Sequence, residues 1–232
     1  MKRTLLKTGD GSYTLHLSEW DEQYHSKNGA IAEALHVFIK EGLHFWNVHN
    51  STSPLSILEI GFGTGLNCIL TYLEAEKLGF QINYTGVEAF PLITKEAESL
   101  NYPILLKDLY GSSLSEKSDI QKVFSDLHET PWEQKVSISE NFLLTKQKKK
   151  FSEIIDSSNF DLIYFDAFGI RVQPELWTEE IFQKMYDALI PGGILVTYAA
   201  NGNARRAMQT VGFTVERLPG PPGKKEMLRA KK

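Results

Sequence analysis

The sequence has almost no cysteine and no long apolar run, and both absences narrow the class of protein. The single cysteine, Cys68, excludes an internal disulfide and argues against a cysteine-based zinc site. No stretch approaches the roughly 20 apolar residues that a membrane-spanning helix needs. The N-terminal segment MKRTLLKTGDG lacks the apolar core of a signal peptide, so we expect a cytoplasmic protein.

Paired histidines at ligand spacing are also missing, and the net charge is modest. The six histidines show no H-x-x-x-H or similar pattern, so no metal is expected. The net charge of −4 does not indicate a nucleic-acid binder, but the charge is unevenly distributed. From Asn203 onward the sequence contains eight basic residues and only two acidic ones. That basic end can supply a phosphate-binding face, although a solvated chain terminus explains it equally well.

The most informative stretch of the sequence runs from Leu55 to Asn67. It lies in a chain of 232 residues, 42% of them hydrophobic, which is typical of one globular domain with attachments. A short apolar run ends in Glu59-Ile60 and is followed by Gly61-Phe62-Gly63-Thr64-Gly65. Apolar residues then recur at helical spacing, so the unit is strand, glycine turn and helix. Glycines allow backbone to approach a ligand closely, and the helix start favours a polar or anionic group. The spacing E-x-G-x-G-x-G differs from the dinucleotide fingerprint and is the form expected for S-adenosylmethionine.

Two further carboxylates follow predicted strands. Ile82 to Val87 reads as a strand ending at Glu88, where an acid commonly accepts the ribose hydroxyls of a nucleoside ligand. Phe160 to Phe165 is an apolar strand ending at Asp166, followed by Ala167-Phe168-Gly169. In a doubly wound sheet, the carboxyl ends of such strands meet at one crevice. We therefore expect Gly61 to Gly65, Glu88 and Asp166 to lie together.

The remaining chain alternates strands and helices and indicates a doubly wound α/β sheet closed by an antiparallel pair. The expected helices are Ala30–His44, a segment starting at Pro91 and ending near Leu100, helices inserted within 101–135, Pro174–Leu189 and Asn203–Val211. The other expected elements are a hairpin over 4–17, a loop over Trp20–Gly29, a turn over Asn50–Pro54, strands Val136–Thr145 and Ile194–Tyr198, a tight turn at Pro191–Gly193, and the pair Thr214–Leu228 around Pro219–Gly223. The basic run Lys146–Lys150 is either an exposed helix start or a phosphate contact.

Three segments together resemble the MnmC/MnmD-type tRNA methyltransferases. They are LEIGFGTGLN, IYFDAFGIRVQPELWT and PGGILVTYAANGNARRAMQTVGFTVERLPGPPGKKEML. Tyr24-His25-Ser26, Asn28-Gly29, Glu33 and His36-Val37-Phe38 also resemble the N-terminal signature of this family. The chain departs from the family at Thr145-Lys146-Gln147, where relatives have Gly-Asp near the adenine, at Gly169 and at Asn203.

The resemblance implies a class I S-adenosylmethionine-dependent fold that methylates 5-aminomethyl-(2-thio)uridine at the tRNA wobble position. Larger relatives carry an FAD-dependent oxidase domain, so this chain resembles the stand-alone form. Residues 1–50 would be an extension packed on the cofactor side, and 51–232 the methyltransferase domain. No membrane, metal or disulfide partner is expected besides the tRNA, and a monomer is compatible with the sequence.

The residues and the resemblance together assign roles to named positions. Asp166 would position the acceptor amine and compensate part of its charge, and Phe168 would stack on the uracil. The expected cofactor-binding residues are Glu59, Gly61, Phe62, Gly63, Thr64, Gly65, Asn67, Glu88, Tyr24 and Glu33. The expected substrate and RNA contacts are Arg205, Arg206, Lys224, Lys225 and Tyr198.

Simpler interpretations exist for several of these residues. Asp166 could cap a helix, Phe168 could belong to the core, and Arg205 and Arg206 could be solvated surface residues. Rival functions are an aminopropyltransferase, a small-molecule methyltransferase and a non-catalytic protein that binds S-adenosylmethionine and RNA. A nicotinamide-dependent dehydrogenase is disfavoured by the glycine spacing.

Overall fold

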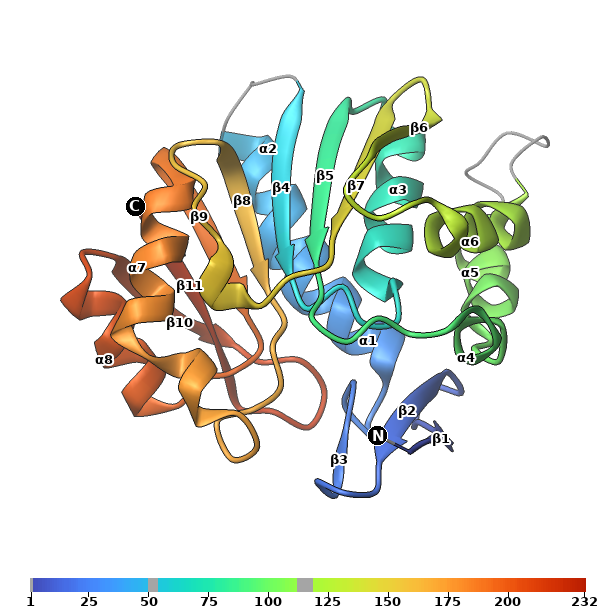
Figure 1. Ribbon diagram of the computed structural model, residues 1–232, viewed down its shortest axis with the longest axis horizontal. Coiled ribbons are helices and arrows are strands. Elements are labelled where there is room, and N and C mark those ends of the chain that lie inside the picture. The colour runs from blue at the N-terminus through green and yellow to red at the C-terminus, as the bar shows by residue number, and fades with distance from the viewer. Residues whose placement is uncertain (1, 50–53, 112–118) are drawn as a thin grey trace.

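The computed structural model describes residues 2–49, 54–111 and 119–232, and it contains one large mixed sheet with helices on both faces (Figure 1). Its strand order is β10-β11-β9-β8-β4-β5-β7-β6. In that order the strands span Thr214–Pro219, Glu226–Lys231, Leu189–Thr197, Phe160–Phe165, Leu55–Ile60, Ile82–Val87, Phe142–Gln147 and Lys135–Ser139. The five central strands are parallel, whereas β6, β10 and β11 pair antiparallel. The predicted α/β fold class with a C-terminal antiparallel pair is confirmed.

The central strands are buried on both faces because each face carries its own hydrophobic core. In β8, Leu162 and Tyr164 join one core, while Ile163 and Phe165 join the other. This alternation follows from the two-residue period of a strand. A strand covered on both faces reads as a continuous apolar run, which is why the sequence shows β4 and β8 so clearly.

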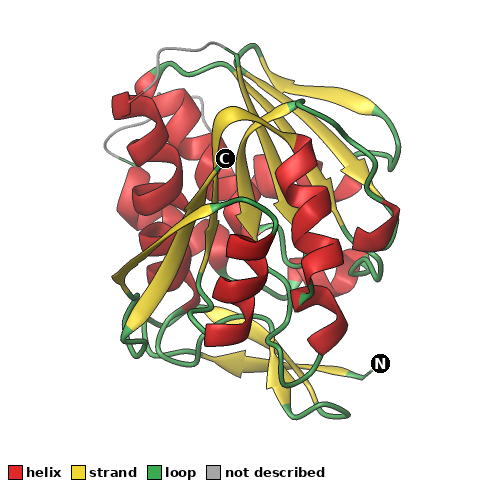
Figure 2. Cartoon of the chain, turned by 90° about the vertical axis from the view of Figure 1, so that its left-hand side faces the viewer, coloured by secondary structure: helices red, strands yellow, loops and turns green. Residues whose placement is uncertain are grey.

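Two groups of helices cover the sheet, as the side view shows (Figure 2). The first core contains residues from a continuous N-terminal helix, α3, α5 and α6, and the second contains residues from α7 and α8. The N-terminal helix consists of α1 (Ala30–Ala34), the π-helical η1 (Leu35–His44) and α2 (Phe45–His49). The remaining helices are α3 (Leu66–Leu78), α4 (Thr94–Glu98), α5 (Tyr102–Tyr110), α6 (Ile120–Glu129), η2 (Phe151–Glu153), η3 (Pro174–Trp177), α7 (Glu179–Ala188) and α8 (Gly202–Thr210). Among the described residues, none of the helices has the length and apolar character to cross a bilayer.

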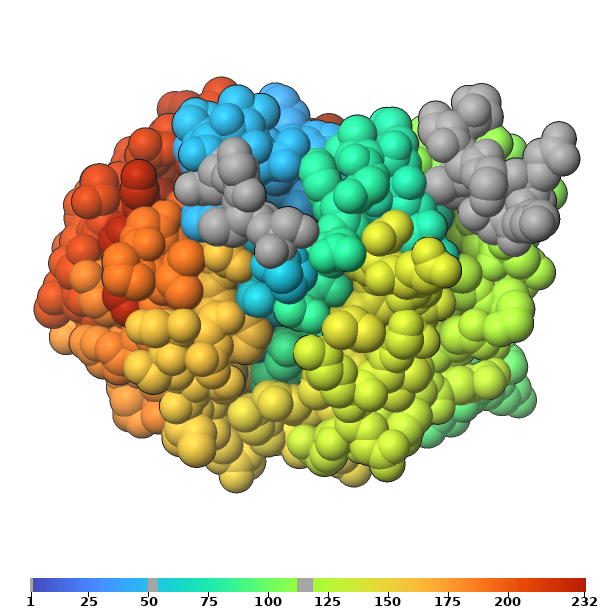
Figure 3. Space-filling model, turned by 90° about the horizontal axis from the view of Figure 1, so that it is seen from above, coloured from blue at the N-terminus to red at the C-terminus, as the bar shows by residue number. Residues whose placement is uncertain are grey.

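A second, three-stranded sheet is formed by β1 (Arg3–Lys7), β2 (Tyr13–Leu17) and β3 (Glu22–Gln23). It lies beyond the carboxyl ends of the parallel strands, at the bottom of Figure 1. Figure 3 views the opposite face of the molecule, where the C-terminal part (orange to red) gathers on one side and residues around 100–150 (green to yellow) on the other. The predicted hairpin over 4–17 is confirmed, and β3 adds a short strand to the segment that was expected to be a loop.

Several predicted elements differ from the structure. The single strand predicted for Val136–Thr145 is wrong, because the chain reverses at Glu140-Asn141 and forms β6 and β7. The alternating pattern continues through that reversal and conceals it. The tight turn predicted at Pro191–Gly193 is instead an irregular part of β9, where the pairing register with β8 shifts.

Several helices begin or end at residues other than those predicted from the sequence. The helix predicted from Pro91 starts at Thr94, and the helix predicted from Pro174 begins as the 3-10 turn η3 before Thr178 caps α7. The Ala30 helix continues past His44 to His49. Residues 50–53 of the turn predicted at Asn50–Pro54, the proposed boundary between residues 50 and 51, and residues 112–118 of the 101–135 insertion lie outside the described residues.

Candidate active site

A cavity of about 1000 Å³ opens at the carboxyl ends of β4, β5 and β8. Its floor is formed by the segments that follow these strands: Gly61–Thr64, Glu88–Phe90 and Asp166–Gly169. Residues from β3 and the loop after it, including Tyr24 and His25, supply another wall, and Lys224 comes from the turn between β10 and β11. The three strand ends that the sequence predicted to converge therefore do so, at the edge of the sheet where ligands of doubly wound folds bind.

The glycine turn is held in place by Glu88 and by close backbone contacts. The carboxylate of Glu88 accepts hydrogen bonds from the backbone N–H groups of Gly63 (3.0 Å) and Phe90 (2.8 Å). Gly61 has φ +91°, and a Cβ there would lie 2.7 Å from the carbonyl oxygen of Asp166. Only glycine fits this position without displacing the Asp166 loop.

Asn67 connects two carboxyl groups at the bottom of the cavity. Its Nδ2 donates to Glu59 Oε1 (3.0 Å) and to Asp166 Oδ2 (2.9 Å). Asn67 stands in the first turn of α3, so the helix carries its amide to the end of β8. Glu59 and Asn67 are both buried, and the Glu59 carboxyl also interacts with the hydroxyl of Tyr84. Asn67 Oδ1 has no hydrogen-bond partner among the described residues, and such a buried polar atom points to a polar ligand in the cavity.

The protonation of these acids is shifted by their surroundings. Burial and the nearby carboxylate of Glu33 raise the pKa of Asp166 to about 7, although the hydrogen bond from Asn67 and the charge of Lys224 oppose that change. Burial also raises the pKa of Glu59 well above its usual range. A carboxyl group with a pKa near neutrality can accept a proton at physiological pH and release it again.

A cation lies among the acids. Lys224 Nζ forms an ion pair with Glu33 Oε2 at 2.5 Å and lies 3.7 Å from the ring centroid of Tyr198. Tyr198 in turn donates its hydroxyl to the carbonyl oxygen of Ala167 (2.8 Å). Glu33 also accepts the backbone N–H of Ser26 at Oε1, so its carboxylate joins the N-terminal segment to the C-terminal turn.

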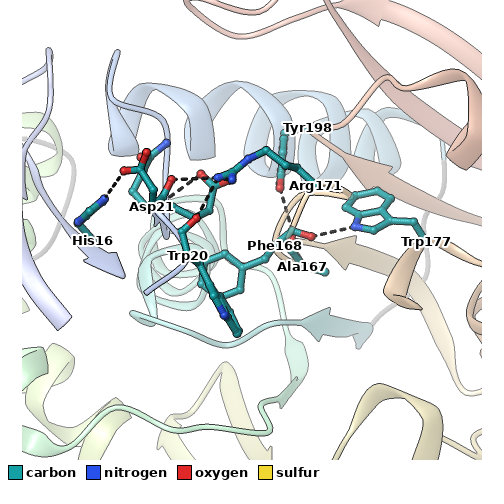
Figure 4. A network of polar contacts seen from close by, with 10 residues as sticks. His16, Trp20, Asp21, Ala167, Phe168, Arg171, Trp177 and Tyr198 are labelled. Atoms are coloured by element: carbon teal, nitrogen blue, oxygen red, sulfur yellow. Dashed lines mark hydrogen bonds and ion pairs between the residues drawn. The ribbon is translucent and has the colours of Figure 1, made fainter. Parts of the chain in front are cut away.

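Phe168 belongs to an aromatic wall at the cavity rim. Its ring makes edge-to-face contacts with Trp20 (5.7 Å) and Tyr24 (5.0 Å), and its carbonyl oxygen accepts the indole N–H of Trp177 (2.8 Å). Figure 4 shows that Arg171, which follows Phe168 in the same loop, forms hydrogen bonds with the N-terminal segment around Trp20 and Asp21. The Arg171 guanidinium donates to the carbonyl oxygens of residues 20 and 21 and to a carboxylate oxygen of residue 22.

The chain resembles known methyltransferases in sequence. Residues 119–232 match a family described as S-adenosyl-L-methionine-dependent methyltransferase. This match covers the C-terminal part of the chain, a little under half of its length. The glycine turn, the acid after β5 and the unpartnered buried amide oxygen of Asn67 fit S-adenosylmethionine, and this agrees with the cofactor expected from the sequence.

More specific relatives are bifunctional proteins. The chain is 30% identical over 220 residues to the "tRNA 5-methylaminomethyl-2-thiouridine biosynthesis bifunctional protein MnmC" of Leptospira borgpetersenii serovar Hardjo-bovis (strain JB197), which covers 91% of this chain and 32% of that protein. The protein of the same name from Hydrogenovibrio crunogenus is 27% identical over 220 residues, covering 90% of this chain and 31% of its own length. The chain therefore spans about one third of the length of these relatives.

Solved structures support the fold. The crystal structure of MNMC2 from Aquifex aeolicus matches with a TM-score of 0.76 at 22% identity, covering 99% of this chain and 70% of that one. Spermidine synthase from Thermotoga maritima matches with a TM-score of 0.58 at 15% identity, covering 99% and 68% of the two chains. At these identities the likeness concerns the fold alone.

Not every residue predicted for the site lines the cavity. Gly65, Arg205, Arg206 and Lys225 do not, and the other predicted residues do. The Thr64 hydroxyl faces His25 Nε2 (3.3 Å) and Tyr102 (3.5 Å), and Phe62 packs so closely on Gly86 that a Cβ there would lie 2.4 Å from its ring. Lys225 and Arg206 are exposed. The roles of all these residues remain predictions.

Several cavity residues were not predicted from the sequence. Arg3 donates to the Tyr24 hydroxyl (3.1 Å), to Glu96 (2.9 Å) and to the carbonyl oxygen of residue 90 (2.8 Å). His25 hydrogen-bonds Thr14 and Thr64, and burial lowers its pKa to about 4. No local pattern marks Arg3, because its partners are distant in sequence. The aromatic residues of the non-periodic Trp20–Gly29 segment were the only available signal for this wall.

The basic run Lys146–Lys150 is not the exposed helix start that was expected. Lys146 lies in β7 and is only 1% exposed, with Nζ donating to the carbonyl oxygen of His128 (2.7 Å) and lying 4.9 Å from the Trp132 ring centroid. Burial lowers its pKa to about 8. The aromatic and carbonyl partners come from α6 and the segment after it, which local sequence does not reveal.

Among the described residues, no group of three or more acidic, histidine or cysteine side chains could hold a metal ion.

Proposed function

We propose that this methyltransferase transfers a methyl group to the amine of 5-aminomethyl-(2-thio)uridine at the wobble position of tRNA. The relationship to the bifunctional proteins named for 5-methylaminomethyl-2-thiouridine biosynthesis, over nine-tenths of this chain, carries the proposal. The match to a methyltransferase family favours the methyl-transfer part of that activity. A tRNA substrate also favours a cytoplasmic location.

The cavity supplies what an amine acceptor needs. S-adenosylmethionine, when bound, offers a methyl group on a sulfonium that leaves as a neutral thioether. The glycine turn and Glu88 would hold it, while Asn67 fixes Asp166 through Oδ2. Among the described residues no hydrogen bond reaches Asp166 Oδ1, which we assign to the acceptor amine. Because an ammonium has no lone pair, the amine must lose a proton, and a carboxylate with a pKa of about 7 can accept it. The sequence predicted positioning and partial charge compensation for Asp166 and argued against strong base catalysis, so proton acceptance by this residue departs from that prediction.

The acceptor base and the RNA backbone have separate candidate surfaces. Phe168, supported by Trp20 and Tyr24, would stack on the uracil, because its ring lies in the cavity wall. Arg205, Arg206 and Lys225 are candidates for phosphate contacts, since they belong to the basic C-terminal region outside the cavity. We also propose that residues 1–50 act as an extension beside the cofactor, which the cavity positions of Tyr24 and Glu33 support.

A small-amine acceptor is the second candidate. Acidic residues are abundant around the cavity and would suit a polyamine: Glu22, Glu33, Glu59, Glu88, Asp166, Glu175 and Glu180. Incubation with putrescine and either S-adenosylmethionine or its decarboxylated form tests this candidate directly. Product from putrescine, with none from tRNA, would favour it.

The main test is nucleoside mass spectrometry. We expect tRNA from cells that lack this gene to accumulate 5-aminomethyl(-2-thio)uridine and to lose the methylated form. The purified protein with S-adenosylmethionine should convert that tRNA in vitro, whereas the Asp166→Ala variant should not. A non-catalytic RNA-binding protein would show no turnover at all. An unchanged nucleoside profile in the deletion strain would contradict the proposed function.

A further inference from the structure

Lys224 is the cation closest to the acids of the candidate active site, and the fold holds it there. Its ammonium lies between the Glu33 carboxylate (2.5 Å) and the Tyr198 ring (3.7 Å), and its side chain is 31% exposed. A phosphate-binding lysine would direct its ammonium outward, whereas Lys224 directs it to a buried carboxylate inside the cavity.

The turn that carries Lys224 is fixed by packing against the N-terminal part of the chain. His36 Nε2 lies 2.8 Å from the carbonyl oxygen of Pro219. Gly223 has φ +84°, and a Cβ there would lie 1.8 Å from the amide nitrogen of Asn28. Gly220 also donates its N–H to the carbonyl oxygen of Lys225. The lysine is therefore placed by a folded turn and not by a free chain end.

The proposed acceptor creates an electrostatic problem that this lysine can relieve. Carboxylates near an amine favour its ammonium form, which cannot attack a methyl group. Two acids, Glu33 and Asp166, face the position of the acceptor, so without a compensating cation the amine would hold its proton more tightly. A fixed positive charge beside both groups favours loss of that proton.

We propose that Lys224 is a positioning residue of electrostatic character, which neutralises Glu33 and favours the unprotonated forms of both Asp166 and the acceptor amine. The effect of Lys224 on the acceptor amine rests on the proposed function. Its effect on the pKa of Asp166 does not, because that effect requires no substrate. The direction agrees with the shifts at Asp166, whose pKa burial and Glu33 raise while Lys224 lowers it.

Other charged or titratable groups face this cluster from the surrounding elements, and the charge of Lys224 also lowers the pKa of one of them, His25. They are Glu59 on β4, Glu88 after β5, Tyr198 after β9, Glu22 on β3 with its partner Arg171, Tyr24 with its partner Arg3, and His25 with Asp10. Burial holds the pKa of His25 at about 4 and raises that of Tyr198 well above its usual range, so neither titrates near pH 7.

The test compares variants that change charge in opposite directions. Lys224→Gln removes the positive charge, Lys224→Arg keeps it, and Glu33→Gln removes the negative charge. We expect Lys224→Gln to move the acidic limb of the kcat/KM profile for tRNA upward by about one pH unit, with activity recovering at high pH. Lys224→Arg should keep the wild-type limb, and Glu33→Gln should move it downward. Lys40→Gln, on the exposed surface of η1, serves as the matched control.

A measurement without the acceptor separates this inference from the proposed function. The carboxyl carbon of Asp166, labelled with ¹³C and assigned with Asp166→Asn, reports its pKa by NMR. We expect that pKa to rise in Lys224→Gln and to fall in Glu33→Gln. The inference would be overturned if the pKa of Asp166 were unchanged in both variants. It would also be overturned if activity fell equally at every pH, with the acidic limb of the kcat/KM profile at its wild-type position. If the wild-type protein methylates no tRNA but the NMR shifts appear, the proposed function fails and the role of Lys224 stands. If Lys224→Gln does not fold, the opposite shift in Glu33→Gln still decides.

Discussion

The side-chain amide of Asn67 lies 2.9 Å from the Asp166 carboxylate and 3.0 Å from that of Glu59, so one residue at the start of α3 aligns two acids. The amide donates both of its protons there. Neither acid could be held so firmly by its own strand, because each stands at the end of β4 or just beyond β8. The alignment of Asp166 therefore depends on a residue that need not touch the substrate.

Asn67→Ala should lower kcat by about 10- to 100-fold, because a hydrogen bond to a charged group contributes about 1.5–3 kcal/mol. The acidic limb of the pH profile should also move upward, since the lost bond normally lowers the pKa of Asp166. Steady-state kinetics across pH checks both effects. Wild-type kcat in a folded Asn67→Ala variant would show that Asp166 needs no such alignment.

Glu88→Ala should weaken S-adenosylmethionine binding by about 10-fold or more, because the glycine turn loses the acceptor of the Gly63 and Phe90 N–H groups. Calorimetric titration measures the change directly. Glu98→Ala, on an exposed position of α4, is the matched control and should bind like wild type. Equal affinity in both variants would remove Glu88 from the cofactor site.

Gly61→Ala should lower the free energy of unfolding by more than Gly79→Ala does. Both glycines have positive φ, +91° and +72°, so both substitutions strain the backbone by about 1 kcal/mol. Only at Gly61 would the new Cβ also collide with the carbonyl oxygen of Asp166. Urea unfolding of the two variants gives the difference. Equal destabilisation would mean that the Asp166 loop moves away without resistance.

Asp166→Asn should abolish most turnover and yet stabilise the fold above pH 7. A carboxyl group whose pKa is raised to about 7 on folding holds its proton more tightly in the folded state. The free energy of unfolding therefore falls as the pH rises from about 4, the pKa of an aspartate in the unfolded chain, to about 7, its pKa in the folded protein. The asparagine variant does not titrate and avoids this loss. Thermal unfolding at pH 5 and pH 8 should show the variant's advantage growing with pH. A constant difference would contradict the raised pKa.

The sequence predicted the sheet and the floor of the site well because both follow local rules. Strand, glycine turn and helix occur within one short segment, and the acids at positions 88 and 166 follow directly after apolar runs. The topology rule for doubly wound sheets then places them together. Nothing beyond the order of elements was needed for that step.

The walls of the site were harder to predict, because they depend on contacts between distant segments. Lys224 belongs to a basic region and was assigned to phosphate binding, whereas the fold turns it toward Glu33. Lys146 sits in a run of basic residues, and only the packing of Trp132 and His128 over β7 buries it. A charge pattern along the chain does not report which residues the fold turns inward.

The pairing of Glu33 with Lys224 joins a helix near the beginning of the chain to a turn near its end. The ribosome releases Glu33 long before Lys224, so this wall of the cavity forms only after the segment that carries Lys224 has emerged. Its closure has to wait for contacts of long sequence separation, which form late and slowly. A nascent fragment that ends before Lys224 would carry the glycine turn and the acids after the strands and yet lack this side of the cavity.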